Sequence, residues 1–322
     1  MIIEEMKKRI VGKNKVLVLP EGDDIRILKA AVRLHKENLC KPLLLGEKEK
    51  IESLAVANGL NLDGIDVLNP LEDKEFDNNV NKMFELRKGK NSLEDCRKML
   101  SGRNYYAIML LYNGLADAAL GGATYSTADT IRPALQIIKT KPGCKIVSSC
   151  FALLKEGSPT LIFGDCGVNV NPSSEELCDI AISSVETARL FNVDPKVAFL
   201  SFSTKGSAKS DEVSKVQNAV ELMKSRDVDF DYDGELQFDA AYDKSTGEKK
   251  APGSNVAGKA NVFIFPDLEA GNIGYKIAQR LGGYEALGPI LQGVKMPVND
   301  LSRGCNEEEV YKMAILSVSQ SL

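Results

Sequence analysis

Short apolar segments alternate with helix-length amphipathic segments in this sequence, and the alternation limits the folds that are open to it. Lys15–Leu19, Pro42–Leu45 and Ile65–Leu68 are apolar and strand-sized. Asp24–Asn38 and Glu47–Ala57 lie between them and repeat apolar residues every three or four positions, which is the helical period. Strands separated by such helices are typical of parallel βαβ units. We therefore predict an α/β fold.

The middle of the chain departs from this pattern. Lys145–Leu154 and Thr160–Phe163 are both apolar, and only the turn Lys155–Pro159 separates them, so we expect adjacent strands joined by that turn. Amphipathic helices are predicted at Ser174–Leu190 and at Glu307–Ser319, each opened by residues that cap helices well.

Two pairs of residues that break regular structure bracket this middle block, Pro142-Gly143 and Gly288-Pro289. We predict two α/β domains: residues 1–141 with 289–322 form domain I, and residues 142–288 form domain II, inserted into it. Clefts between such domains are where ligands usually bind. The binding site is therefore expected in an interdomain cleft.

Charge and apolar content exclude several classes of partner. The formal net charge is −4 with both signs interspersed, and without a basic stripe or tail neither nucleic acid nor an anionic membrane is expected as a partner. The longest apolar runs, such as 261–265, fall far below the roughly 18 residues of a membrane span. Residues 1–15 lack the apolar core of a signal peptide, and the seven cysteines include no CxxC pair. These features predict a cytoplasmic protein.

The sequence contains one histidine, His35, and no tryptophan. A Ser-His-Asp triad, a Cys-His pair or a histidine-containing metal site would have to use that one residue. His35 lies inside a predicted amphipathic helix, where a structural or surface role explains it. We expect catalysis without imidazole, and we predict neither a metal site nor a bound cofactor.

The segment 121–132 has the features of an anion site. It begins Gly-Gly-Ala, so a ligand could approach the backbone closely. Ser126, Thr127 and Thr130 offer hydroxyl groups. If a helix spans Asp129–Lys139 as predicted, Arg132 lies in its first turn. The helix dipole disfavours a cation there unless an anion is also present. The pattern favours anion binding here.

A second segment, Ser203–Ser210, leaves two interpretations open. It follows the predicted strand Lys196–Phe202 and precedes a helix, a place where backbone N–H groups bind anions. It is equally well explained as a polar connection whose last residue, Ser210, caps the following helix.

The last motif runs from Pro297 to Glu309 and places Ser302 and Arg303 just before a helix. Glu309 stands three residues after Asn306, which is the spacing of a capping box. Alternatively, the Glu309 carboxylate lies one turn from a serine and an arginine and accepts a proton from a substrate. The residues alone favour the cap.

Several long stretches, in this order, resemble the phosphate acetyltransferase (phosphotransacetylase) family along nearly the whole chain. The resemblance rests on Glu85–Lys88, Asp129–Gln136, Ser203–Ser210, Asp233–Gln237, Ala251–Asp267, Gly271–Leu281 and Gly288–Cys305. It implies two α/β/α domains of the isocitrate/isopropylmalate dehydrogenase-like type and a homodimer. It also implies the reaction acetyl-CoA + phosphate = acetyl phosphate + CoA, in a ternary complex without metal or covalent intermediate. Coenzyme A, acetyl phosphate and inorganic phosphate are the implied partners.

Roles for individual residues follow from the same resemblance. Ser302 would stabilise the charge that develops on the acetyl oxygen, and Arg303 would hold phosphate or the acyl phosphate. Glu309 would be the general base that deprotonates the CoA thiol, although the family pattern has Asp at this position. The pKa values of the two acids are similar, so the chemistry can be retained.

Four further residues receive substrate-binding roles from the resemblance. Arg87 and Arg132 would bind the phosphates of the two substrates, and Ser126 and Thr127 would surround acetyl phosphate. The alternatives are the same chemistry on a longer acyl group, as in a phosphate butyryltransferase, and an NAD(P)-dependent oxidoreductase of related fold. The second lacks support in the sequence, because no GxGxxG motif is present.

Overall fold

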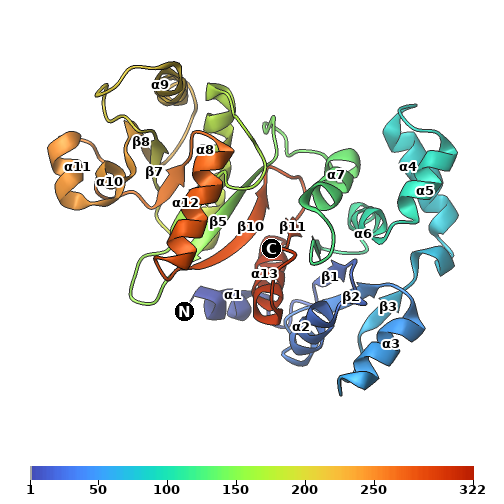
Figure 1. The fold of residues 1–322 in the computed structure, drawn as a ribbon. Coiled ribbons are helices and arrows are strands. Elements are labelled where there is room, and N and C mark those ends of the chain that lie inside the picture. The colour runs from blue at the N-terminus through green and yellow to red at the C-terminus, as the bar shows by residue number, and fades with distance from the viewer. Residues whose placement is uncertain (1) are drawn as a thin grey trace. The chain divides into compact units, whose positions relative to one another are not determined.

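The structure is a computed structural model that describes residues 2–322. The chain divides into two compact units: unit 1 comprises Met1–Pro142 and Val294–Leu322, and unit 2 comprises Gly143–Gly293 (Figure 1). Each unit contains one sheet with helices on its faces. Within residues 2–322, no helix combines the length and apolar character needed to cross a membrane.

The sheet of unit 1 has five strands in the order β11-β4-β1-β2-β3, and all neighbours are parallel. The prediction of parallel βαβ units is confirmed here. β11 lies beside β4 although about 180 residues separate them in the chain, so the end of the sequence completes this sheet. The strands are β1 (Val16–Leu19), β2 (Lys41–Leu45), β3 (Asp66–Leu68), β4 (Ala118–Gly121) and β11 (Val298–Asp300).

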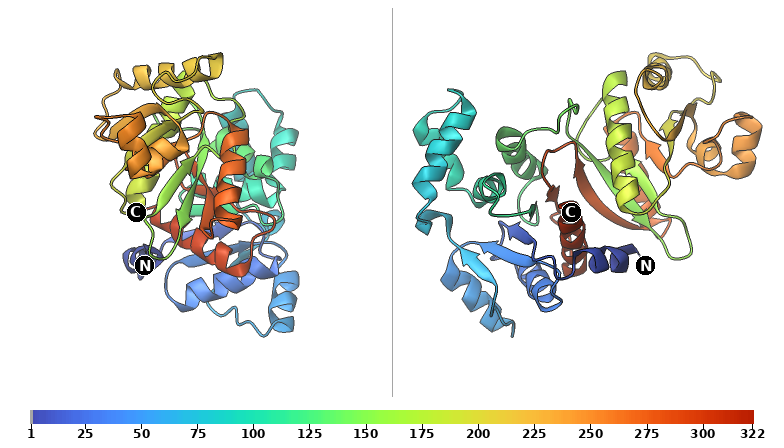
Figure 2. Two further views of the ribbon diagram at one scale, coloured as in Figure 1. Left: turned by 60° about the vertical axis from the view of Figure 1, so that its left-hand side comes forward. Right: turned by 180° about the vertical axis from the view of Figure 1, so that it is seen from behind.

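Helices cover both faces of this sheet (Figure 2). Helices α2 and α13 pack against each other on one face, and α6 and α7 pack against each other on the other face. His35 lies on α2 with its ring against Gly64, in the structural role expected for it. The helices are α1 (Ile2–Ile10), α2 (Ile25–Lys36), α3 (Lys48–Ala57), the 3₁₀ helix η1 (Pro70–Glu72), α4 (Phe76–Arg87), α5 (Leu93–Leu100), α6 (Arg103–Tyr112), α7 (Thr127–Ile137) and α13 (Glu307–Ser319).

The sheet of unit 2 has six strands in the order β10-β5-β6-β9-β7-β8. β5 and β6 are antiparallel neighbours, which confirms the prediction of two adjacent strands joined by a turn. β6, β9, β7 and β8 run parallel, and β10 is antiparallel to β5. The strands are β5 (Ser148–Leu154), β6 (Leu161–Gly164), β7 (Lys196–Leu200), β8 (Asp231–Leu236), β9 (Val262–Ile264) and β10 (Glu285–Gln292).

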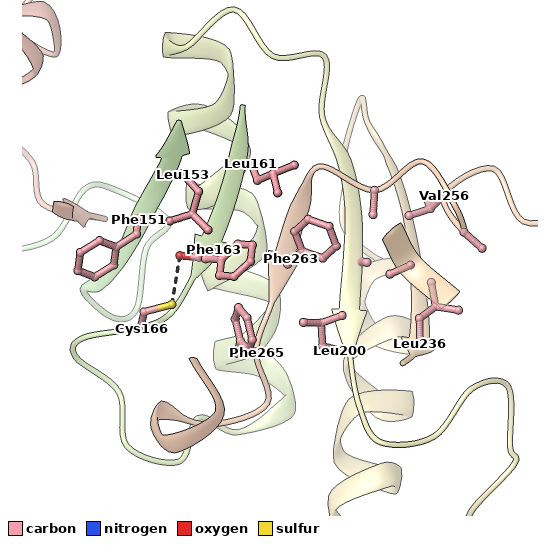
Figure 3. Close-up of a cluster of buried hydrophobic side chains, with 14 of the residues drawn as sticks. Phe151, Leu153, Leu161, Phe163, Cys166, Leu200, Leu236, Val256, Phe263 and Phe265 are labelled. Carbon is pink, nitrogen blue, oxygen red and sulfur yellow. Dashed lines mark hydrogen bonds between the residues drawn. The ribbon is translucent and has the colours of Figure 1, made fainter. Parts of the chain in front are cut away.

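Aromatic side chains pack together with aliphatic ones in a buried hydrophobic cluster of unit 2 (Figure 3). The ring centroids of Phe163 and Phe263 are 5.4 Å apart, and those of Phe163 and Phe265 are 5.0 Å apart, distances at which aromatic pairs stabilise a core. Phe151 stacks on Tyr275 of α12 at 4.0 Å. The helices of this unit are α8 (Ser174–Leu190), α9 (Asp211–Met223), α10 (Phe238–Tyr242), α11 (Lys244–Lys250) and α12 (Leu268–Arg280).

Gly288-Pro289 does not end the middle block, so the breaker interpretation is wrong at this point. The pair lies inside β10, and unit 2 continues to Gly293. Proline has no N–H group to donate, and it is tolerated in a sheet at an edge strand or a bulge. β10 is an edge strand, and its pairing with β5 shifts register between Leu287 and Ile290. The ladder is interrupted there without ending the strand.

Candidate active site

The loop of residues 121–126, called the glycine loop below, binds a carboxylate of the protein itself. Glu21 follows β1, and its side chain is only 1% exposed. Its carboxylate accepts hydrogen bonds from the backbone N–H groups of Ala123 and Tyr125, both at 3.0 Å, and from the N–H and hydroxyl groups of Thr124. The sequence predicts an anion at this loop, and in the structure Glu21 takes these backbone donors.

Helix α7 begins two residues earlier than predicted. Ser126 is its N-cap: the side chain accepts from the N–H of Asp129 at 3.3 Å and donates to its carboxylate at 2.6 Å. Because the helix starts at Thr127, Arg132 lies in its second turn. The prediction that Arg132 lies in the first turn is therefore wrong, and the helix dipole gives no reason to expect an anion beside it.

Pro133 lies in the interior of α7, where it cannot donate to the carbonyl of Asp129. The side-chain amide of Asn104 donates to that carbonyl at 2.8 Å. Asn104 belongs to α6, which packs against α7. The hydrogen bond that the proline removes is thus supplied by a neighbouring helix, and α7 is fixed to α6 at this turn.

The positive charges of Arg87 and Arg132 both affect the pKa of the Tyr105 hydroxyl group. Burial raises the pKa of Tyr105, and the positive charges of Arg132 and Arg87 act in the opposite direction. The Arg87 Nε donates to Asn91 at 2.8 Å, and Arg132 is 57% exposed, with its guanidinium 3.8 Å from a carboxylate oxygen of Asp129. Two guanidinium groups with few protein partners therefore lie close enough to the same tyrosine to affect its pKa.

The loop of residues 302–305, called the Ser-Arg loop below, starts where β11 ends. β11 is parallel to β4, so the Ser-Arg loop and the glycine loop leave the sheet at the same edge. The N–H of Leu301 donates to the carbonyl of Gly121 at 2.7 Å. The side chains of Ser302 and Arg303 are exposed, and the Ser302 hydroxyl accepts from the N–H of Gly304 at 3.3 Å.

Glu309 forms the capping box expected from its spacing. Its N–H donates to the Asn306 side chain, and its Oε2 accepts from the N–H of Asn306, both at 2.9 Å. Within residues 2–322, no other hydrogen bond or ion pair engages the Glu309 carboxylate. Oε1 therefore remains outside the cap.

Cys305 is not a thiolate near neutral pH. Burial raises the pKa of its thiol to about 11, although the positive charge of Arg26 acts to lower it, and the charge of Glu309 adds to the rise. A nucleophilic cysteine needs a lowered pKa. The structure thus gives no reason to assign Cys305 a covalent role.

Asp300, which the sequence analysis missed, carries a buried carboxylate at the end of β11. It is 1% exposed, and neither of its oxygens makes a hydrogen bond of full geometry within residues 2–322. Burial raises its pKa to about 6; Thr127 and Thr130 lie close enough to lower it, and the charge of Glu21 raises it. Gly122 is required beside it, because a Cβ there would overlap Asp300 Oδ1.

The loop of residues 203–208, called the serine loop below, also binds an internal carboxylate. Glu235 accepts from the Ser203 hydroxyl at 2.9 Å, from the N–H of Gly206 at 2.6 Å and from Gln217 at 3.1 Å. Burial alone would raise the pKa of Glu235, but these hydrogen bonds lower it below its usual value. Ser210 caps α9, which confirms the second interpretation of this segment.

The site residues predicted from the sequence all lie in unit 1: Arg87, Ser126, Thr127, Thr130, Arg132, Ser302, Arg303 and Glu309. The N–H of Thr130 donates to the carbonyl of Ser126 at 3.1 Å. Within residues 2–322, no side-chain hydrogen bond or ion pair joins any two of them directly. They are brought together in part by the adjoining ends of β4 and β11, from which the glycine and Ser-Arg loops leave. Among all the residues that the structure describes, 2–322, no three His, Cys, Asp or Glu side chains are arranged to hold a metal ion.

Known proteins match this chain along nearly its whole length. Residues 1–318 match the profile of the family described as phosphate acetyl/butaryl transferase. The chain belongs to that family. A phosphate acetyltransferase of Bacillus subtilis (strain 168) is 49% identical over 321 residues, which are 100% of this chain and 99% of that one.

Two solved structures are similar at the same level of identity. A phosphotransacetylase from Streptococcus pyogenes has a TM-score of 0.96 and 49% identity, and the match covers 99% of this chain and 98% of that one. EutD phosphotransacetylase from Staphylococcus aureus has a TM-score of 0.92 and 49% identity, with 100% and 98% covered. The family inferred from the motifs is confirmed, and this chain is an acyltransferase. The comparisons bear out the prediction of a phosphate acetyltransferase and favour neither alternative.

Proposed function

We propose that this acyltransferase moves an acetyl group reversibly between coenzyme A and inorganic phosphate. In one direction a phosphate oxygen attacks the thioester carbonyl of acetyl-CoA, the C–S bond breaks, and acetyl phosphate and CoA are released. In the other direction the CoA thiolate attacks acetyl phosphate and phosphate leaves. The full-length match to relatives named phosphate acetyltransferase, at 49% identity, carries this proposal.

The Ser-Arg loop supplies the groups closest to the reacting atoms in this proposal. Ser302 donates a hydrogen bond from its hydroxyl to the acetyl oxygen as negative charge develops there, and Arg303 binds the phosphate with its planar guanidinium. The exposure of both side chains supports these roles. So does the hydrogen bond of 2.7 Å between Leu301 and Gly121, which fixes the loop beside the glycine loop.

Arg87 and Arg132 bind the phosphate groups of the two substrates. Their guanidinium groups lie near one tyrosine and are largely free of protein partners, which supports binding of an external anion. Thr127 is exposed at the first position of α7 and donates to acetyl phosphate. Ser126 supports this surface by fixing the start of the helix. Thr130 is buried, with its hydroxyl near the Asp300 carboxylate, so we propose that it supports the helix from within and does not contact substrate.

Glu309 is the general base for the CoA thiol. Its Oε2 fixes the side chain to the start of α13, and Oε1 remains free to accept the proton. The glutamate side chain is one methylene longer than the aspartate expected from the family pattern, and its attachment to Asn306 positions that longer side chain. The usual thiol pKa of about 8.5 requires only modest assistance near neutral pH.

The substitution Glu309→Gln separates the cap from the base. Gln can still accept the hydrogen bond of Asn306, so we expect little loss of stability, whereas kcat should fall by about 10²-fold or more because the proton acceptor is lost. Glu308→Gln is the matched control, since Glu308 lies on the same turn and pairs with Arg33. Unchanged turnover in Glu309→Gln would leave Glu309 as a cap only.

Release of CoA thiol from acetyl-CoA in phosphate buffer tests the function itself. Acetyl-CoA should be used faster than butyryl-CoA, but each methylene changes the free energy of pocket binding by only about 1–3 kcal/mol. A preference for butyryl-CoA would overturn the choice of acetyl. Dialysis against EDTA should leave the rate unchanged, since we propose a reaction without metal or bound cofactor.

We extend the proposal to the wider architecture. The two units are domains of the isocitrate/isopropylmalate dehydrogenase-like type, the enzyme acts in the cytoplasm, and two copies form a homodimer. The interdomain cleft stays a prediction from the sequence. Light scattering on the purified chain tests the homodimer, because a single copy has a mass of 35.1 kDa.

A further inference from the structure

Arg26, on the first turn of α2, uses every N–H group of its guanidinium within unit 1. Its Nε and one terminal nitrogen donate to the two carboxylate oxygens of Asp24 at 2.9 and 2.7 Å. The same terminal nitrogen donates to the carbonyl of Ala123 at 2.9 Å. The other terminal nitrogen donates to the carbonyls of Arg303 and Cys305, both at 2.9 Å.

These contacts join the two loops of the candidate site. Ala123 belongs to the glycine loop, and the other two carbonyls belong to the Ser-Arg loop, 277 and 279 residues away from Arg26 in the chain. A guanidinium group presents five N–H donors in one rigid plane. A lysine ammonium has three donors at a single point and cannot span the same set of carbonyls.

Asp24 fixes the direction of the guanidinium group. Its carboxylate also accepts from the backbone N–H of Arg26 at 2.9 Å, so it caps α2 and binds the Arg26 side chain at once. Burial would raise the pKa of Asp24, but hydrogen bonds from Arg26 hold it below its usual value. Asp24 is therefore ionised at neutral pH, and the pair acts as one fixed unit.

We propose that Arg26 is a positioning residue for acyl transfer: it fixes the backbone of the Ser-Arg loop against the glycine loop, and so determines where Ser302 and Arg303 meet the substrates. This inference rests on the function proposed above. It also separates Arg26 from the arginines proposed to bind phosphate. All five of its N–H groups are bonded to the protein, so none remains for a ligand.

Arg33 provides a matched control on the same helix. Its Nε donates to Glu37 at 3.1 Å, one terminal nitrogen donates to Glu308 at 2.6 Å, and the guanidinium lies 3.6 Å from the ring centre of Tyr311. Arg33 therefore joins α2 to α13, and these partners lie outside both loops. Loss of Arg33 reports the general effect of weakening the contact between these helices.

The experiment compares Arg26→Lys, Arg26→Ala and Arg33→Ala in the intact chain, by thiol release from acetyl-CoA with phosphate varied. We expect Arg26→Lys to lower kcat by about 10- to 100-fold, because a displacement of about 1 Å at reacting groups costs up to 10²-fold. KM for phosphate should change less than threefold. Arg33→Ala should lower the melting temperature and leave kcat within twofold.

A second readout is chemical rescue. Added guanidinium ion at millimolar concentration should restore part of the kcat of Arg26→Ala, because it can occupy the space beside Asp24, and it should not restore Arg26→Lys. If Arg26→Ala does not fold, Asp24→Asn carries the test. Asparagine still caps α2 but no longer fixes the guanidinium, so kcat should fall without a matching change in KM.

Three results would overturn the inference: wild-type kcat in Arg26→Lys, an equal fall of kcat in Arg33→Ala, or a rise in the KM for phosphate with kcat unchanged. The last would mean that Arg26 binds substrate. A wild-type chain that releases no thiol from acetyl-CoA contradicts the proposed function instead, and so the two failures are distinct.

Discussion

Glu21 binds the glycine loop of unit 1 through three backbone N–H groups and a hydroxyl, and Glu235 binds the serine loop of unit 2 through one backbone N–H and one hydroxyl. Both loops follow a parallel strand and lead towards a helix. An anion was predicted at the glycine loop and was one of two open interpretations at the serine loop, and in both the bound anion is a buried glutamate. Small and hydroxyl residues after a strand thus predict anion binding without identifying the anion.

The two loops differ in what surrounds them. In the serine loop two hydroxyl groups bond to the loop's own backbone. The Ser203 hydroxyl accepts from the N–H of Ala208, and the Ser207 hydroxyl accepts from the N–H of Thr204, both at 3.0 Å. The glycine loop instead leads to an exposed threonine at the start of α7 and lies against the Ser-Arg loop. The same kind of internal carboxylate therefore stabilises an ordinary connection in unit 2, whereas in unit 1 it stabilises a surface that we propose to be catalytic.

The largest effect is expected from Glu21→Ala. It leaves three N–H groups and a hydroxyl without their acceptor, which should lower the free energy of unfolding by about 3–5 kcal/mol. Because the glycine loop then shifts, kcat should fall by about 10²-fold. Urea unfolding and thiol release measure the two effects, with Glu21→Gln as an isosteric control of intermediate effect. Wild-type turnover in Glu21→Ala would remove the distinction between the loops.

Asp300→Asn tests a buried carboxylate that no loop binds. The Asp300 pKa rises from 3.8 to about 6 on folding, so the native protein holds the proton more tightly and loses stability as pH rises from about 4 through 6. The cost above pH 6 is on the order of 3 kcal/mol. The asparagine variant, which does not titrate, should be more stable than wild type at pH 8 and similar at pH 4.5. Thermal unfolding at both values checks this.

The exposed Asp63→Asn is the control for that experiment. Its melting temperature should follow wild type at both pH values. If Asp300→Asn were less stable than wild type at pH 8, the Asp300 carboxylate would have a favourable partner, and its contrast with Glu21 would be lost.

A smaller change is expected from Glu235→Ala, about 2 kcal/mol in the free energy of unfolding. The lowered pKa means that Glu235 contributes stability above its unfolded value of 4.5, and that the contribution is lost as pH falls through the folded pKa. The difference from wild type should therefore shrink in acid. The kcat of the folded variant should stay within fivefold of wild type; a fall as large as that of Glu21→Ala would make the serine loop catalytic too.

The smallest pair of changes compares one hydroxyl from each loop. Thr124→Val removes a donor to Glu21, and Ser207→Ala removes the acceptor for the N–H of Thr204. Each should cost about 1 kcal/mol in unfolding free energy. We expect a severalfold loss of kcat in the first variant only. Equal kinetic effects would show that the two loops do not differ in function.

Local signals in the sequence account for the parts of the fold that were predicted. The bounds of α8 and α13 match the prediction, because each helix opens with a capping box, Ser173 with Glu176 and Asn306 with Glu309. β11 was missed because Val298–Asp300 is short and largely polar, and its partner β4 is distant in the sequence. The start of α7 was misplaced because its cap, Ser126, was interpreted as a ligand for substrate.

Residues of the candidate site were predictable only where they belong to a recognisable motif. Ser302 and Arg303 belong to a long family stretch, so the resemblance was sufficient to find them. Glu21, Arg26 and Asp300 have no such signal, since their contacts are made with loops that lie about 100 to 280 residues away or with a strand edge. A glutamate after a strand has the same local pattern as a solvated turn, and only the folded chain shows that it is buried.

The discontinuity of unit 1 affects the order in which the two units can fold during synthesis. Unit 2 is one continuous stretch and can fold while translation continues, whereas the outer edge of β4 stays open until residues 294–322 leave the ribosome. Arg26 is translated long before its carbonyl partners at 303 and 305, which follow 277 and 279 residues later. A nascent chain therefore exposes an unpaired edge of β4 until β11 has been made.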